Sequence, residues 1–287
     1  MKLTELFKNK KSTLSFEVFP PKTGDGFESV SEAVKKIAAL SPDYISVTYG
    51  AGGSNAGLAA AIAAEIRRDC GVTPLAHFSC ITSTKESVAE YLCGLKENKI
   101  ENILALRGDL PAGFDASTLT YRHASDLVAE IKAQGDFCVG GACYPEGHPE
   151  SPSQADDIEG IRRKVEAGCD FLTTQMFFDN NILYNYLFKL LDAGISIPVV
   201  AGIMPVTTPK NIRRICALSG LSLPPRFKMI LDRYGDNPAA MKQAGIAYAT
   251  EQIIDLYANG IHAVHVYAMN KPDVAEKIRD NLSAIIA

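Results

Sequence analysis

A strand-like segment followed by a helical segment occurs eight times along the 287 residues of this chain, and this repetition limits the fold more than any other feature. The strand-like runs are short, apolar and rich in β-branched and aromatic residues. They lie at 14–19, 44–50, 74–80, 102–108, 137–145, 171–178, 197–205 and 263–270. Repeated β–α units of about 30 residues imply parallel strands with right-handed crossovers, and eight of them predict a closed α/β barrel of the (β/α)8 type, a TIM barrel. A doubly wound open sheet is the alternative, although it usually has fewer strands.

The gap before the eighth run is longer than the others and holds two further helical segments, at 223–235 and 237–260. We expect these to be extra helices inserted before strand 8. No linker, charge block or low-complexity stretch divides the sequence. We therefore expect a single barrel domain over residues 1–287, a length that single α/β barrels reach.

Composition argues against several classes of protein. The net charge of −4 gives no reason to expect nucleic acid or an anionic membrane as a partner. No apolar run approaches the roughly 20 residues that span a bilayer, and the N-terminus, which predicts a basic first helix, lacks the apolar core of a signal peptide. The seven cysteines form no CxxC pair and lie in apolar segments, a pattern typical of reduced thiols in a cytoplasmic protein.

One carboxylate lies in the middle of a predicted buried strand. Glu17 belongs to the first strand-like run, LSFEVF. Side chains alternate along a strand, so Phe16 and Val18 are expected to face the helices while Ser15 and Glu17 face the barrel interior. Active sites of such barrels lie at the C-terminal ends of the strands. Glu17 is therefore expected either to pair with a neighbouring Arg or Lys or to belong to an active site.

Polar residues also lie near the ends of other predicted strands. They are Thr48, His77, Arg107, Asp109, Tyr144, Gln175 and Tyr267. Taken singly, each has an ordinary structural explanation, such as a hydrogen-bonded core histidine or a tyrosine at the rim. Because they converge on one mouth of the predicted barrel, together they favour a functional site there.

The helical segment 154–168 has a face of patterned polar residues. Asp157, Gly160, Arg163 and Lys164 recur at helical spacing. This face suits a carboxylate for a ribose hydroxyl and two cations for a pyrophosphate, but spacing alone favours a solvated face with local ion pairs. The sequence has no GxGxxG after a strand and no HxH or HExxH, so it predicts neither a Rossmann dinucleotide site nor a metal site.

Taken together and in order, eight motifs resemble those of methylenetetrahydrofolate reductases. They are SFEVFPPK, VTYGAGG, LAHFSC, ALRGDLP, YPEGHPE, TTQMFFD, GIMPV and HVYAMN, and they extend over nearly the whole chain. The resemblance implies a (β/α)8 barrel that binds FAD without a Rossmann fold. It also implies reduction of 5,10-methylenetetrahydrofolate to 5-methyltetrahydrofolate by a ping-pong scheme, with NADH or NADPH as co-substrate, in the one-carbon metabolism that leads to methionine.

The resemblance also implies roles for individual residues. Glu17 occupies the position of the catalytic acid, and Asp109 that of the acidic residue near the flavin and the folate pterin. The FAD-contacting positions are Thr48, Tyr49, Ala51, His77, Arg107, Gly108, Asp109, Ala124, Tyr144, His148, Asp157, Arg163 and Lys164. The substrate-binding positions are Gln175, Asn211, Tyr267 and Lys271.

Four positions depart from the family pattern. Gly160 stands where a side-chain amide is expected, and Lys271 stands where an Arg is usual. Asn211 replaces a Gln, and Ile215 replaces an aromatic residue that stacks on the folate. These departures leave the chemistry intact and bear on how tightly the folate and its tail are bound.

The chemistry requires an acid, because the imidazolidine ring of the folate opens only when N10 is protonated. Burial beside Phe16, Val18 and Phe19 is expected to raise the pKa of Glu17 and keep it protonated. Asp109 is expected to stay ionised near Arg107 or the solvent, where its charge stabilises the iminium cation.

Other functions remain open from the sequence. A barrel aldolase would use a Lys at a strand end, and no predicted strand ends in one. A flavin-free barrel that serves only in binding or assembly would be expected to lack Glu17 or Asp109. A partner protein could deliver the electrons in place of a nicotinamide. We expect a cytoplasmic homo-oligomer without a regulatory domain after residue 287.

Overall fold

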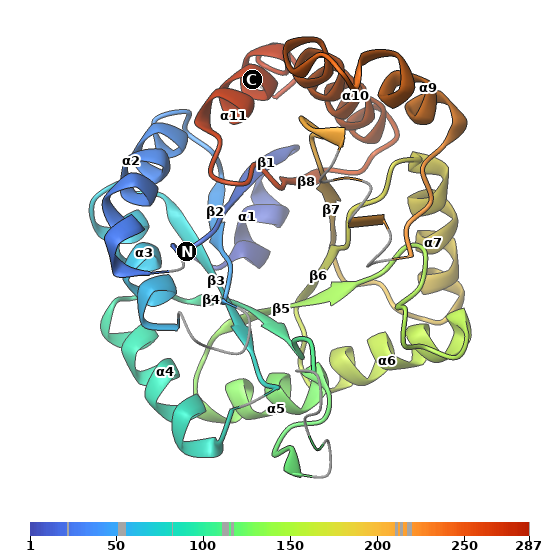
Figure 1. Cartoon of the computed structure of the whole chain (residues 1–287). Coiled ribbons are helices and arrows are strands. Elements are labelled where there is room, and N and C mark those ends of the chain that lie inside the picture. The colour runs from blue at the N-terminus through green and yellow to red at the C-terminus, as the bar shows by residue number, and fades with distance from the viewer. Residues whose placement is uncertain are drawn as a thin grey trace.

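The computed structural model describes residues 1–21, 23–50, 56–81, 83–110, 115, 118–209, 212, 215–216 and 220–286. Eight parallel strands pair in chain order and close into a barrel, as Figure 1 shows. The predicted (β/α)8 fold is therefore confirmed, and the open-sheet alternative is wrong.

All eight predicted strands form. Their bounds are β1 Thr13–Val18, β2 Tyr44–Val47, β3 Thr73–Ser79, β4 Asn102–Leu106, β5 Cys138–Cys143, β6 Phe171–Thr174, β7 Val199–Ile203 and β8 Ala263–Val266. The predicted runs extend past the C-terminal ends of these strands, because the residues that follow leave the sheet and form the loops of the barrel mouth.

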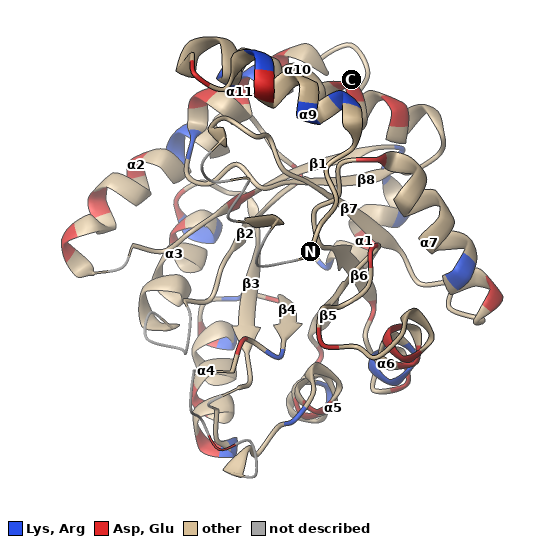
Figure 2. Ribbon diagram, turned by 45° about the vertical axis from the view of Figure 1, so that its right-hand side comes forward, with Lys and Arg blue, Asp and Glu red and all other residues tan. Residues whose placement is uncertain are grey.

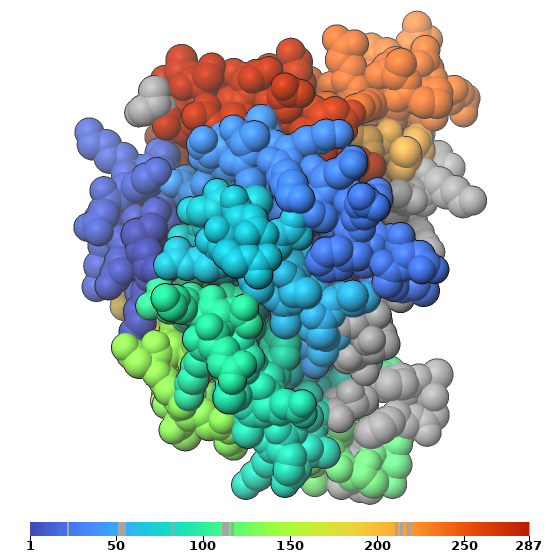
Figure 3. Space-filling view, turned by 90° about the vertical axis from the view of Figure 1, so that its left-hand side faces the viewer, coloured from blue at the N-terminus to red at the C-terminus, as the bar shows by residue number. Residues whose placement is uncertain are grey.

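The helices surround the barrel. Their bounds are α1 Leu3–Asn9, α2 Phe27–Ala38, α3 Ala56–Arg68, α4 Lys85–Glu97, α5 Ala124–Gln134, α6 Gln154–Glu166, α7 Asn180–Asp192, α9 Pro225–Tyr234, α10 Pro238–Ala258 and α11 Pro272–Asn281, with a short 3-10 turn at Gly24–Gly26. Side-chain caps define several of their starts: Ser153, for example, accepts a hydrogen bond from the Asp156 N–H at the start of α6. Figure 3 shows α2, α3 and α4 side by side over one face of the barrel.

The predicted alternation along the first strand is confirmed. Leu14, Phe16 and Val18 lie in the main core between strands and helices, together with Val30 and Val34 of α2. Ser15 and Glu17 occupy the other face and lie inside the barrel. Charged residues accordingly gather on the outer helices and the loops, while the strands are nearly free of them (Figure 2).

Helix α1 closes the N-terminal end of the barrel and appears in the middle of the ring of strands in Figure 1. Leu3 and Leu6 are buried against inward-facing residues at the starts of the strands, such as Tyr44 and Phe171. The Leu3 N–H donates to the Asn102 side chain at 2.9 Å, which fixes the helix to β4. The sequence predicted the helix but not its position.

The two helices predicted before strand 8 are α9 and α10, so this prediction is confirmed as well. They belong to a third apolar cluster beside the mouth of the barrel, in which the Phe227 ring of α9 stacks on Phe178 at 5.4 Å between centroids. This cluster also contains Ile215 and Tyr267.

All seven cysteines are free thiols, and four of them are buried, whereas Cys93 is exposed. Over the ranges that the structure describes, no helix has both the length and the apolar character needed to cross a membrane.

Candidate active site

A cavity of about 640 Å³ lies at the C-terminal ends of β4 and β5 and against α5 and α6. Its volume is within the range of small-molecule sites, and its position is the one that active sites of this fold occupy. Eleven of the residues assigned above by strand position or by resemblance line it. They are Tyr49, Arg107, Gly108, Asp109, Ala124, Tyr144, His148, Asp157, Arg163, Lys164 and Gln175.

The other assigned residues lie elsewhere. Glu17 and His77 are inside the barrel, and Thr48 follows β2, with its N–H donating to the Val18 carbonyl at 3.0 Å. Tyr267 and Lys271 follow β8. Two predictions, Ala51 as an FAD contact and Asn211 as a folate contact, fall outside the described residues.

Glu17 is an uncharged carboxyl in the barrel interior. Its residue is only 6% exposed, and burial raises its pKa to about 8. A basic side chain, His77, lies close by, with its Nε2 3.8 Å from Oε2 of Glu17. Burial lowers the pKa of His77 to about 3, so both groups are uncharged at neutral pH. In the part of the chain that the structure describes, no Lys or Arg forms an ion pair with Glu17, so the salt-bridge explanation has no support among these residues.

The cause of this burial differs from the one expected. Phe16 and Val18 lie on the opposite face of β1, in the core under the helices, so they do not surround the carboxyl. The groups inside the barrel bury it instead: Ser46 is its partner in register on β2, and His77 lies across from it on β3. Residues adjacent in sequence on a strand point to opposite faces of the sheet, so Phe16 and Val18 cannot cover the carboxyl of Glu17.

A histidine that sequence reasoning did not single out lies deeper in the barrel. The ring of His265 is hydrogen bonded at Nδ1 to the Ser15 hydroxyl (2.7 Å) and at Nε2 to the Ser46 hydroxyl (2.9 Å). It stacks on Tyr44 at 5.6 Å between centroids, and burial lowers its pKa to about 3. The sequence contains a signal for this position: His265 alternates with apolar Val264 and Val266, and this pattern predicts that it faces inward.

The Arg107 side chain forms an ion pair with Glu150, and both residues line the cavity. Its guanidinium donates to both carboxylate oxygens of Glu150, at 2.5 and 2.8 Å. This pairing raises the pKa of Arg107 and lowers the pKa of Glu150. Asp109 is exposed to solvent, which is one of the two surroundings expected for it, while the hydrogen-bonded partner of Arg107 is Glu150. Glu150 was not among the predicted FAD contacts, although it lines the cavity.

The turn after β4 depends on Gly108. Its φ is +87°, and a Cβ there would lie 2.1 Å from Oγ of Ser79. Only glycine fits both conditions without strain. The turn brings Arg107 and Asp109 to the cavity wall.

Helix α6 forms a second wall. Asp157, Gly160, Arg163 and Lys164 all line the cavity; Arg163 is exposed, as a solvated face would have it, whereas Asp157 is buried. Asp157 is 7% exposed, its Oδ2 has no hydrogen-bond partner among the described residues, and burial raises its pKa. The Lys164 ammonium donates to the Ala142 carbonyl at 2.7 Å, and burial lowers its pKa. This wall offers a free acceptor and two cations to a ligand.

The residues assigned to substrate binding lie near the ends of β6 and β8. The Tyr267 hydroxyl donates to the Thr174 carbonyl at 2.5 Å, and this close contact requires Gly202, whose Cβ would lie 2.4 Å from that hydroxyl. The Lys271 ammonium donates to the Thr207 hydroxyl at 2.8 Å. The Gln175 side chain accepts from the Met176 N–H at 2.9 Å.

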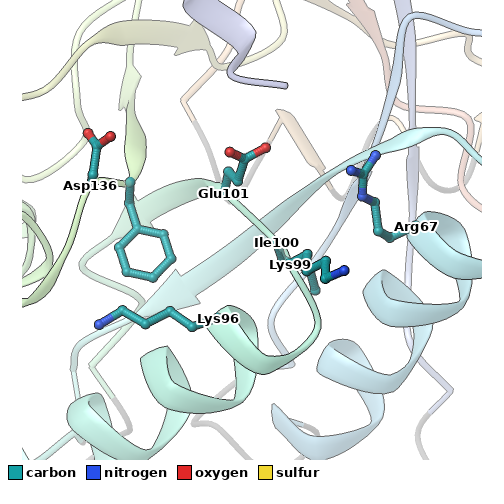
Figure 4. A pocket seen from close by; sticks show the side chains of 7 residues that line it. Arg67, Lys96, Lys99, Ile100, Glu101 and Asp136 are labelled. Atoms are coloured by element: carbon teal, nitrogen blue, oxygen red, sulfur yellow. The ribbon is translucent and has the colours of Figure 1, made fainter.

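A second cavity of about 400 Å³ lies at the opposite end of the barrel, before β4 and β5 (Figure 4). Its acidic residues are already paired: Glu101 with the N-terminal amine and Asp136 with Lys2. Its basic residues include Arg67 and Lys96, which lie in the last turns of α3 and α4, where cations stabilise a helix end. Ion pairs and positions at helix ends thus account for these charged residues. Active sites of this fold lie at the opposite, C-terminal end of the strands.

The fold and the first cavity define a (β/α)8 barrel with a cavity at its C-terminal mouth and a buried carboxyl inside the barrel. The chain belongs to the methylenetetrahydrofolate reductase family, whose sequence model matches residues 2–283.

The chain is 30% identical over 265 residues to the 5,10-methylenetetrahydrofolate reductase of Escherichia coli. The matched region covers 92% of this chain and 88% of that protein. It is 34% identical to methylenetetrahydrofolate reductase (NADH) 1 of Zea mays, over 99% of this chain but 50% of the maize protein. The chain thus spans about half the length of its plant relatives.

Among solved structures, the chain is similar to an uncharacterized protein from Clostridium thermocellum that binds two copies of 5-methyl-5,6,7,8-tetrahydrofolic acid. The TM-score is 0.64 over 99% of this chain and 98% of that one, at 16% sequence identity. At this identity the similarity shows a shared fold and no more.

Proposed function

We propose that this protein reduces 5,10-methylenetetrahydrofolate to 5-methyltetrahydrofolate, with NADH or NADPH as the reductant and FAD as the bound cofactor. Membership of the family supports the reaction. The single observation that carries the mechanism is the uncharged carboxyl of Glu17 inside the barrel, near its C-terminal mouth.

The cavity at the mouth suits FAD, although the chain has no Rossmann motif. The unpaired Oδ2 of Asp157 would accept a ribose hydroxyl, and Arg163 and Lys164 would bind the pyrophosphate. Tyr49, Tyr144 and His148 would contact the rest of the cofactor from the other walls. When held by these residues, FAD would supply the hydride-transfer chemistry that links the nicotinamide to the folate.

Glu17 would act as the general acid of the folate half-reaction. The folate must open its imidazolidine ring before it can accept hydride, and opening requires a proton at N10. A carboxyl with a pKa of about 8 still holds its proton at neutral pH and can donate it to that nitrogen. An exposed glutamate would be ionised at this pH and could not.

Asp109 would have the opposite role. Its exposed carboxylate lines the cavity, where a negative charge would stabilise the iminium cation that ring opening produces. Gln175, Tyr267 and Lys271 would contact the folate. We further propose that the protein works as a homo-oligomer in the cytoplasm.

The test begins with the absorption spectrum of the purified protein. We expect a flavin band that NADH or NADPH bleaches without oxygen and that methylenetetrahydrofolate then restores. Glu17→Gln should keep the bleaching step and lose the restoring step. Equal loss of both steps would contradict the role of Glu17 as the folate acid.

Two other outcomes would favour rival functions. A colourless protein that takes up no added FAD would favour a flavin-free barrel. A flavoprotein that no nicotinamide bleaches, but that the folate can reoxidise after chemical reduction, would favour a partner protein as the electron donor.

A further inference from the structure

Gly160 occupies an unusual position in the middle of α6. Glycine inside a helix is less favourable than alanine, because it loses more conformational freedom on folding. The usual structural reasons for it are a left-handed backbone or close packing. Neither applies to Gly160: its φ is not in the left-handed region, and a Cβ would have no atom within 4 Å outside its own stretch of helix.

The surroundings of Gly160 suggest a reason that involves a ligand. It lies on the cavity wall one turn after Asp157 and one turn before Arg163 and Lys164. Along the helix axis the distance from residue 157 to residue 164 is about 10 Å. The wall therefore consists of a buried acceptor, a strip of bare backbone and two cations, in that order.

We propose that Gly160 is a specificity-determining residue, which lets the ribose of a nucleotide ligand lie directly on the backbone of α6. The sugar hydroxyl would reach Oδ2 of Asp157, and the phosphates would reach Arg163 and Lys164. Glycine is the residue that allows a ligand to approach a backbone this closely. The proposal rests on the proposed binding of FAD and adds to it which part of the cofactor this chain recognises through its backbone.

A competing explanation makes a different prediction. The family pattern has a side-chain amide at this position, so Gly160 would simply lack one contact to the cofactor. In that case Gly160→Asn should strengthen FAD binding, whereas a ribose lying on the bare backbone leaves no room for the new side chain.

The experiment compares Gly160→Ala, Gly160→Asn and a matched control, Gly94→Ala. Gly94 also lies inside a helix with no atom within 4 Å of an added Cβ, but on α4, and it does not line the cavity. Thermal unfolding of the FAD-free full chain gives Tm, and titration with FAD, followed by flavin fluorescence, gives Kd. FMN, which lacks the adenosine ribose, is titrated in parallel.

We expect both alanine variants to raise the Tm of the FAD-free protein by about 2 °C, because alanine favours the helix. Gly160→Ala should nevertheless raise the Kd for FAD roughly tenfold, and Gly160→Asn should raise it further, as unwanted groups in a fitted site do. Gly94→Ala should leave that Kd unchanged, and FMN should bind all four proteins equally.

Gly160→Ala that binds FAD as tightly as the unaltered protein, or Gly160→Asn that binds it more tightly, would overturn this inference while leaving the proposed function intact. An unaltered protein that binds no FAD at all would instead overturn the proposed function, and this inference with it.

Discussion

Replacing Glu17 with Gln should change how the stability of the protein depends on pH. Burial raises the pKa of Glu17 from 4.5 to about 8, so between these pH values the folded protein holds a proton that the unfolded chain has lost. The contribution of Glu17 to stability therefore falls as pH rises through this window, by about 1.4 kcal/mol per pH unit. Over the whole window the contribution is on the order of 5 kcal/mol. Gln does not titrate, and the variant should lack this dependence.

The two buried histidines act in the opposite direction. Burial lowers the pKa of His77 and His265 from 6.5 to about 3, so the unfolded chain takes up protons that the folded protein does not as pH falls below 6.5. The folded protein therefore loses stability as the pH falls below 6.5. The contributions of the three groups together place the stability maximum near pH 6.5, with Glu17 responsible for the decline above it.

Urea unfolding of the protein and of Glu17→Gln, repeated from about pH 5 to about pH 8.5, measures the difference directly, because all other groups cancel. The stability of the variant relative to the unaltered protein should increase with pH across this range. An exposed control, Glu28→Gln, should follow the unaltered protein at every pH. A difference that stays constant with pH would refute the reasoning, since Glu17 would then be ionised in the folded state.

Three further changes test other parts of the structure. Asp109→Asn should slow folate reduction and change the flavin potential, as stopped-flow kinetics and redox titration would show; unchanged values would remove Asp109 from the mechanism. Asp157→Ala should weaken FAD binding roughly tenfold in a fluorescence titration, because the ligand loses a buried acceptor, and an unchanged Kd would mean that the ligand does not use it. Leu6→Ala, under the barrel, should lower the free energy of unfolding by about 3 kcal/mol, whereas the exposed control Leu191→Ala should change it by less than about 0.5 kcal/mol.

The strands and helices could be predicted because their signals are local. Alternation with a period of two placed Glu17 inside the barrel, and the helical pattern in the long gap placed α9 and α10. The position of α1 could not be predicted in the same way. A short amphipathic helix looks the same in sequence whether it covers the outside of a barrel or closes its end.

The same limit applies to the partners of the site residues. Arg107 pairs with Glu150, which is 43 residues away in the sequence, and no local pattern connects the two. For the face of α6, local spacing favoured solvent, because the choice between solvent and a cavity depends on where the helix lies relative to the mouth. The order of the eight motifs indicated indirectly, through the family resemblance, that this face of α6 belongs to a site.

The proton of Glu17 stays on the carboxyl because the neighbouring base, His77, binds a proton less tightly. His77 is close enough to receive it, with Nε2 3.8 Å from Oε2, but its pKa of about 3 lies well below the value of about 8 for Glu17. Transfer would create two charges where burial disfavours both. Below them, burial holds His265 neutral as well, while the Ser15 and Ser46 hydroxyl groups are hydrogen bonded to its ring. The interior around Glu17 is therefore polar but uncharged, so in the proposed mechanism the carboxyl would still hold its proton when N10 of the folate approaches.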